Sequence, residues 1–325
     1  MLKLDNEQHT LILPLLESKE DEICLPLALN VILTYWGEYN LNKEAKERAR
    51  KYNDIRGSIF IEGFELAESR GYLVSIFRGN IQGLKKKIDQ GIPSIVILPG
   101  LKDTMQHAMV ISGYNPEENR IVTYVPQPDT VGSIPEKKFT ELWEQDGSLT
   151  ITIIPVDMKD INDKETSNTD RSYRMCFEAE RLLLTGKTKE AIEKLRNAVD
   201  TNKSNELALD MLGSIYNELK SEEAKDYFEA SIKVNPKFYL SYRGIGNYYL
   251  RKEEYLLAEK SYSSAISINP NRFGPIYKNR GIVRLKLDDK EGAISDLNMY
   301  LDQCPQANDK NNIELALKDL SSKKP

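Results

Sequence analysis

The sequence predicts two domains of different fold class, an α+β domain in residues 1–156 and an all-α solenoid in residues 171–325. The first half carries helical patterns followed by short β-branched segments, which is the order expected of an α+β domain with an antiparallel sheet. The second half repeats itself at steps of 33 to 35 residues, a period typical of helical arrays. Between them, residues 157–170 are polar and lack apolar periodicity, so we expect a linker there.

The helices of the first half are expected near its beginning. Residues 25–36 are apolar on almost all sides, which predicts a buried helix, and residues 41–52 are amphipathic. A third helix is expected to end near Gly71. The elements that follow in the chain are a strand at YLVSIF, a helix through IQGLKKKIDQG, strands at IPSIVIL, HAMVISGY and RIVTYV, a helix near 136–145 and a strand at LTITIIP.

Small and helix-ending residues recur at fixed positions in the second half. Gly246 and Ala258 are small where two antiparallel helices must approach closely, and Pro270 ends the second helix of its unit. The recurring positions are Ala191, Ala224, Ala258 and Ala293; Gly213, Gly246 and Gly281; and Pro236, Pro270 and Pro305. This pattern resembles the tetratricopeptide repeat, strongly in the units that start near 206, 239 and 274 and more weakly near 172, with a capping helix at 309–322.

Repeat arrays of this kind bury a core by stacking and present a concave face. We therefore expect a protein partner on the concave face of the repeats, with a rigid spacer or a dimerisation surface as the alternative. Cys176 and Cys304 fall within the repeat pattern and are expected to be buried thiols.

Composition excludes several classes of function. The net charge of −5 and the lack of a dense Lys/Arg block favour neither nucleic acid nor membrane binding. No apolar window approaches the roughly 20 residues that span a bilayer, and no export signal is recognisable, so the chain is expected to be cytoplasmic, although a signal already removed would leave no trace. Three scattered cysteines and two histidines without a CxxC or HExxH pattern predict no metal and no cofactor.

Cys24 stands where an acidic run, ESKEDE, meets the apolar helix. Pro26 is favoured in the first turn of a helix, so the sequence places Cys24 at a helix N-terminus. There the unpaired N–H groups and the positive end of the helix dipole lower the pKa of a thiol. Such a thiolate is the nucleophile that a cysteine hydrolase needs.

A nucleophilic thiol also needs a base, and His107 is the candidate. It begins the segment HAMVISGY after a polar loop, so its ring is expected to face a cleft between helix and sheet. His9 lies too near an N-terminus that is expected to be unstructured. On its own such a Cys/His pair is weak evidence, because a buried Cys and a strand-edge His are more often structural.

The order CLPLALNVILTYWG, GIPSIVIL and QHAMVISGYNPEENRIVTYVP resembles the papain-like double-glycine leader peptidases that process bacteriocin precursors, over roughly residues 10–155. The resemblance implies a papain-like cysteine peptidase fold with Cys24 as nucleophile and His107 as general base. The combination of such a domain with tetratricopeptide repeats is similar to a bacterial group of peptidase-like proteins of uncertain substrate.

Two supporting positions depart from that family. A glutamine that helps to hold the oxyanion is replaced by Ser18, whose hydroxyl reaches less far. An aspartate that orients the histidine is replaced by Val125, which cannot do so. Gln127, on the same strand face as Val125, could orient His107 through its amide oxygen, and Asp129 is the other candidate.

We therefore expect a cysteine peptidase or amidase that uses a Cys24/His107 dyad on a peptide or protein recruited by the repeats. An inactive peptidase-like scaffold that binds a peptide without cutting it is the main alternative, and a papain-like acyltransferase, with an amine in place of water, is the second. The two departures are what a scaffold predicts, whereas the presence of both Cys24 and His107 favours an enzyme.

Overall fold

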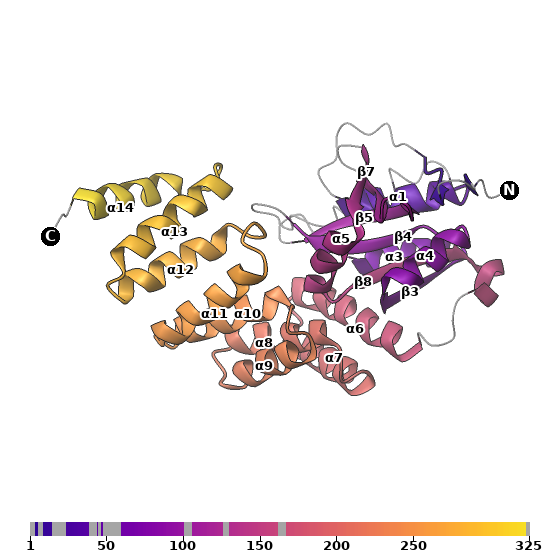
Figure 1. Ribbon diagram of the computed structural model, residues 1–325. Helices are drawn as coiled ribbons and strands as arrows, with labels where there is room; N and C mark the ends of the chain where they lie inside the picture. Colours follow the sequence, from indigo (N-terminus) through magenta and orange to yellow (C-terminus); the bar gives the residue numbers. More distant parts are fainter. Residues whose placement is uncertain are drawn as a thin grey trace. The chain divides into compact units, whose positions relative to one another are not determined.

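Figure 1 shows the computed structural model of the chain, which describes residues 4–5, 9–14, 24–38, 44, 47, 60–100, 106–125, 130–161 and 167–322. The chain forms two compact units. The first consists of Met1–Leu98 with His107–Ala208, and the second of Pro99–Gln106 with Leu209–Pro325. The first contains an α+β region with an antiparallel sheet, and the second is helical, as the sequence predicts.

The first unit is built on an eight-stranded sheet in the order β1-β2-β5-β4-β8-β3, with β6 beside β5 and β7 beside β6. The strands are β1 Leu4–Asp5, β2 Thr10–Leu11, β3 Tyr72–Arg78, β4 Ser94–Pro99, β5 Gln106–Asn115, β6 Arg120–Val125, β7 Thr130–Pro135 and β8 Leu149–Pro155. Five of them were expected. The sequence gives no signal for β1 and β2, which are too short to show alternation, or for β7, whose TVGSIP reads as a turn because of its glycine and proline.

Helices cover both faces of this sheet. Ile95 and Ile97 of β4 belong to a buried cluster with residues of α1, α3 and α6, whereas Val96 and Leu98 belong to a second cluster with α4 and α5. Because side chains alternate along a strand, these clusters lie on opposite faces. The helices are α1 Cys24–Tyr35, α3 Phe60–Ser69, α4 Ile81–Asp89, α5 Glu136–Trp143, α6 Ser167–Leu184 and α7 Thr188–Thr201.

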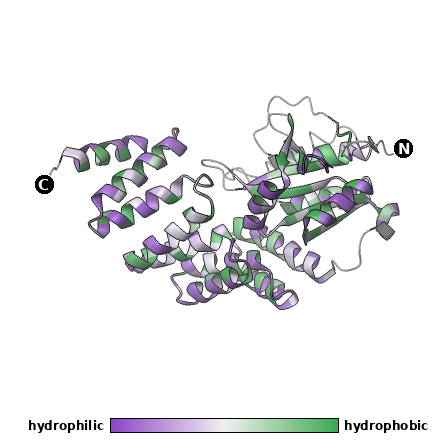
Figure 2. Ribbon diagram, viewed as in Figure 1, coloured by the Kyte–Doolittle hydropathy of each residue, from purple (hydrophilic) through white to green (hydrophobic). Residues whose placement is uncertain are grey.

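The hydropathy of the chain agrees with this layering. Figure 2 shows hydrophobic residues concentrated on the strands, whereas the helices carry both colours. Most of the predicted helix at 41–52 lies outside the described residues. Glu44 and Glu47 are described, and both are helical.

Helix α6 closes one edge of the sheet. The Asp170 carboxylate accepts a hydrogen bond from the backbone N–H of Ile76 in the edge strand β3, at 3.1 Å. Phe177 stacks on Phe60 with ring centroids 4.6 Å apart and belongs to the same buried cluster as the strands. The guanidinium of Arg174 donates to both oxygens of Glu68, at 2.7 and 2.6 Å. These contacts occupy N–H groups and apolar surface that an edge strand otherwise leaves open.

An ion pair between the exposed Arg78 and the buried Glu206 ties the start of α8 to the same strand. Glu206 is 1% exposed, and its carboxylate lies 2.6 Å from Nη2 of Arg78 in β3. The hydroxyl of Tyr173 donates to the same carboxylate at 3.3 Å. Gly147 leaves room for this carboxylate, because a Cβ at that position would overlap Glu206 Oε1.

The junction between the two halves contains helical segments. Residues Val156–Ile161 form a 3-10 helix, and α6 begins at Ser167, inside the range 157–170. The weak repeat expected near 172 corresponds to α6 and α7, which belong to the first compact unit.

The second unit is a succession of helices. They are α8 Glu206–Glu218 from Leu209 onward, α9 Glu223–Val234, α10 Tyr239–Arg251, α11 Tyr255–Ile268, α12 Pro275–Lys286, α13 Lys290–Gln303 and α14 Lys310–Ser322. The helices α9, α11 and α13 each end two residues before Pro236, Pro270 or Pro305, as predicted. A Cβ at Gly246 would lie 2.6 Å from a ring carbon of Tyr262, so the glycine is required by close helix packing.

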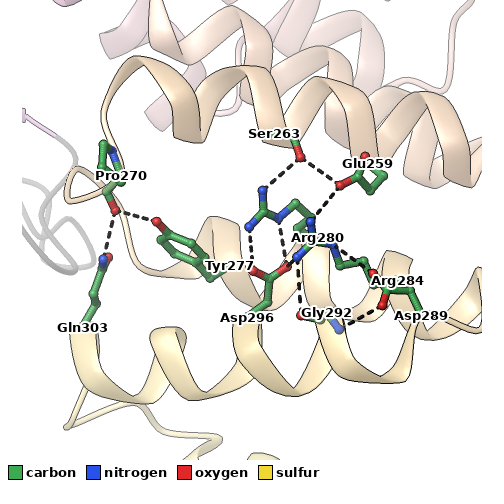
Figure 3. Close-up of polar contacts among 10 residues, drawn as sticks. All are labelled: Glu259, Ser263, Pro270, Tyr277, Arg280, Arg284, Asp289, Gly292, Asp296 and Gln303. Atoms are coloured by element: carbon green, nitrogen blue, oxygen red, sulfur yellow. Dashed lines mark hydrogen bonds and ion pairs between the residues drawn. The ribbon is translucent and has the colours of Figure 1, made fainter.

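An ionic network joins three of these helices (Figure 3). The guanidinium of Arg280 in α12 donates to both oxygens of the buried Asp296 in α13, at 2.9 and 2.7 Å. Arg284 adds a third bond to Asp296 and binds Glu259 of α11 at 3.0 Å. Asp289 of the α12–α13 turn is a third carboxylate, 3.6 Å from Arg284 Nε. Such directional pairs favour one packing register over others.

Candidate functional site

Cys24 is the first residue of α1, as the sequence predicts. Farther along the same helix, the side chains of Ala28, Val31 and Ile32 are fully buried. The backbone therefore places Cys24 at the positive end of a buried helix, although its side chain lies outside the described residues.

The opposite end of α1 is fixed to one end of the sheet. The hydroxyl of Tyr35 donates to the carbonyl of Gly91 at 2.9 Å, and Nε1 of Trp36 donates to the carbonyl of Ile153 at 2.8 Å. Both acceptors lie where β4 begins, because Ser94 of β4 pairs with Thr152 of β8. The C-terminus of α1 thus lies at the start of β4.

The N-terminus of α1 reaches the other end of β4. Twelve helical residues span about 17 Å, and the six residues of β4 span about the same distance. Strand β4 ends at Pro99, and its neighbour β5 starts at Gln106. A connection of six residues is long enough to join antiparallel strands but too short for a parallel crossover. Strand β5 therefore begins at the end of the sheet where β4 ends. Cys24 and His107 therefore lie at the same end of the sheet.

Strand β6 ends at this place too. Val110 of β5 pairs with Tyr124 of β6 in antiparallel register, so β6 runs toward the start of β5 and ends at Val125. Gln127 and Asp129, the candidates for orienting His107, follow that strand in the sequence. Both of them, and Ser18, lie outside the described residues.

The surroundings of His107 favour a neutral imidazole. It is half-buried near the start of β5, and this burial lowers its pKa below the usual value. By strand alternation it shares a side of β5 with Met109, whereas α1 packs with Ala108 and Val110 on the other side. A contact with Cys24 therefore has to form around the end of the strand, not between helix and sheet.

His9 is ordered, contrary to the expectation for the N-terminus. Its Nδ1 lies 2.9 Å from both Asp89 Oδ1 and the hydroxyl of Tyr114, and its ring stacks on that of Tyr114. Tyr114 stands seven residues after His107 on β5, which corresponds to about 23 Å. His9 therefore lies at the opposite end of the strand from His107 and cannot serve a nucleophile at Cys24. Sequence reasoning missed this cluster because its members are distant in the chain.

Two other expectations concern thiols and metals. Cys176 and Cys304 are buried free thiols, as predicted. Within the described part of the chain, no group of three or more His, Cys, Asp or Glu side chains could hold a metal ion. In the same part of the chain, no helix is both long and apolar enough to cross a bilayer.

Comparison with known families agrees with this architecture. Residues 7–151 match the Peptidase_C39 like family, and residues 208–238 and 241–272 match the tetratricopeptide repeat. The chain thus carries a peptidase C39-like domain followed by tetratricopeptide repeats, a class of repeat that binds proteins. No curated protein sequence matches it.

Solved structures resemble this chain over less than half its length. Pseudomonas aeruginosa pilF is 17% identical with a TM-score of 0.43, and the match covers 48% of this chain and 70% of pilF. MamA from Desulfovibrio magneticus RS-1 is 17% identical with a TM-score of 0.41, covering 48% and 90%. The first tetratricopeptide-repeat domain of Spaghetti (RPAP3), solved with an HSP90 peptide, is 24% identical with a TM-score of 0.33, covering 36% and 90%.

Proposed function

We propose that the first unit is a cysteine peptidase or amidase and that the repeats recruit its peptide or protein substrate. The observation that carries the proposal is the convergence of three chain positions at one end of the sheet: the start of α1, the start of β5 and the end of β6. A nucleophile at a helix N-terminus and a base on an adjacent strand are the parts that thiol hydrolysis requires.

The proposed reaction has two steps. The Cys24 thiolate attacks the carbonyl carbon of an amide, and protonated His107 gives its proton to the leaving amine, which leaves an acyl-thioester. Water then adds to the thioester while His107 accepts its proton, which releases the carboxylic acid and restores the Cys24 thiolate and the protonated His107. An amine in place of water would give acyl transfer, and a product with a new amide bond would identify it.

Two observations favour a second function, a peptide-binding scaffold without catalysis. The position from which a carboxylate orients the histidine in related peptidases is Val125, the last residue of β6. Burial also lowers the pKa of His107, whereas a partner thiolate would raise it. In this second function the same end of the sheet holds an extended peptide and releases it intact.

The rate of Cys24 alkylation by iodoacetamide as a function of pH separates the two functions. Site-resolved mass spectrometry follows Cys24 in the full chain, while buried Cys176 and Cys304 serve as internal references for the folded state. A thiolate–imidazolium pair gives an apparent thiol pKa well below the ordinary value of about 8.5, and it rises in His107→Ala.

A matched control is His9→Ala, because His9 stands at the far end of β5. The enzyme proposal expects this variant to leave the Cys24 pKa unchanged. A Cys24 pKa that is ordinary or raised and indifferent to His107→Ala contradicts catalysis and supports the scaffold.

A further inference from the structure

Two of the terminal strands of the sheet, β3 and β7, have different surroundings. At β3, the Asp170 carboxylate accepts from the Ile76 N–H, and α6 packs against the strand. At the other side, β7 pairs only with β6 among the described residues. A sheet edge without a neighbour presents main-chain N–H and C=O groups to any extended chain that can reach it.

The half of β7 that lies farther from Cys24 and His107 is protected against strand addition. Arg120 donates from Nε to the Ser133 hydroxyl and from Nη2 to the Ser133 carbonyl, both at 2.7 Å. Pro135 ends the strand and has no N–H to offer. A cation and a proline are devices by which proteins commonly blunt an edge.

The nearer half of β7, Thr130–Gly132, has no such protection from the residues that the structure describes. The segment carries no charged residue, and Val131 is 57% exposed. Its backbone is already extended, because Val125 pairs with Thr130 and Tyr124 with Val131. An uncharged and pre-extended half-edge with an exposed Val131 is a suitable template for strand addition.

This half-edge begins at the end of the sheet that holds Cys24 and His107. Thr130 lies opposite Val125, and β6 ends beside the start of β5. A chain paired with Thr130–Gly132 would therefore leave β7 at the end of the sheet where the N-terminus of α1 lies.

We propose that Thr130–Gly132 is a docking edge for an extended segment of the polypeptide substrate, which adds to β7 as a further strand. The inference rests on the proposed function in that the docked chain is the one that Cys24 would attack. Recognition through the main chain implies tolerance of substrate sequence, with a preference for β-branched residues beside Val131.

A second copy of this chain is a less suitable occupant. Two copies that pair through Thr130–Gly132 would share a ladder of only three residues, and ladders this short are marginal by themselves. A substrate segment that is also held at the proposed Cys24 site would not depend on the ladder alone.

Amide hydrogen exchange tests the proposal in the full chain carrying Cys24→Ser, so that a bound polypeptide stays intact. The probe is β-casein, an unfolded polypeptide, at saturating concentration. We expect β-casein to slow exchange in residues 130–132 several-fold. Val131→Lys, which places a charge on the edge, should abolish the effect, whereas the uncharged β-branched Val131→Thr should keep it.

Three results overturn the docking edge: no slowing by β-casein, slowing that persists in Val131→Lys, or slowing without casein that increases with protein concentration, which indicates a second copy. Cleavage of casein by the parent chain is measured separately. Slowed exchange without cleavage supports the docking edge and contradicts the peptidase, whereas cleavage without slowed exchange overturns the docking edge alone.

Discussion

The β3 edge and the β7 edge of the sheet differ in how they are covered. At β3 the structure places a helix from the repeat region, an aromatic stack and an ion pair with the buried Glu206. At β7 it places one arginine and one proline, and these protect only the half farther from Cys24 and His107. The comparison indicates that contacts at the first edge serve stability, whereas among the described residues the second edge has no further strand beside it. Substitutions at the two edges should therefore have unequal effects.

The largest effect is expected for Phe177→Ala. This ring is buried and packs on Phe60 and Phe64 under the sheet. Truncation of a buried aromatic side chain costs about 3–5 kcal/mol, and chemical denaturation of the first unit would measure it. Val131→Ala at the other edge is the control, and a similar loss there would erase the contrast.

Arg78→Ala should follow closely. It leaves the Glu206 carboxylate buried without its cation, at a cost of about 3 kcal/mol if that group stays ionised and less if it takes up a proton. The double variant Arg78→Met with Glu206→Gln removes both charges and should regain much of the loss. If Arg78→Ala melts like the parent, the ion pair does not close this edge.

Asp170→Ala should cost about 1–2 kcal/mol, because it leaves the Ile76 N–H without its acceptor. Asp170→Asn keeps an acceptor oxygen and should cost less. Equal losses in the two variants would show that the hydrogen bond to β3 contributes little.

The β3 edge should also respond to pH. Burial raises the pKa of Asp170 to about 6, despite the opposing Ile76 N–H and Arg174. A carboxyl with a raised pKa binds its proton more tightly when folded, so its contribution to stability is greatest below the unfolded value and declines as pH rises through about 6. The melting temperature of the first unit should be higher at pH 5 than at pH 7.5, by roughly 2–4 °C for each kcal/mol, and Asp170→Asn should reduce the difference.

The smallest effect is expected for Val131→Lys. An exposed substitution outside any core changes the free energy of unfolding by no more than about 0.5 kcal/mol. Thermal melting should not distinguish this variant from the parent, even where exchange with β-casein does. A large loss of stability would show that β7 is covered in the folded chain.

Local signals predicted much of this fold. The start of α1 at Cys24 follows from an apolar run and from Pro26, and the ends of α9, α11 and α13 follow from the prolines after them. Strand β7 could not be predicted, because its conformation depends on pairing with β6. The start of α6 at Ser167 was also missed, because its polar first turn is stabilised by a strand almost a hundred residues earlier.

The candidate site divides in the same way. That Cys24 begins a helix and that His107 stands at the start of a strand could be inferred from nearby residues. Their location at one end of the sheet follows from two facts: β4 and β5 are adjacent strands, and Tyr35 and Trp36 anchor the C-terminus of α1. No local sequence pattern predicts that β4 and β5 are adjacent. The roles of Ser18, Gln127 and Asp129 stay predictions.

The docking of α6 has a consequence for protein engineering. A chimera that exchanges the repeat array at the polar segment 157–170 would separate β3 from Asp170, Phe177 and Glu206. The peptidase-like part would then have an uncovered edge strand. A seam placed after Ala208 keeps all of these contacts within one piece. The interchangeable module of this architecture is thus longer than the peptidase-like sequence by one helical hairpin.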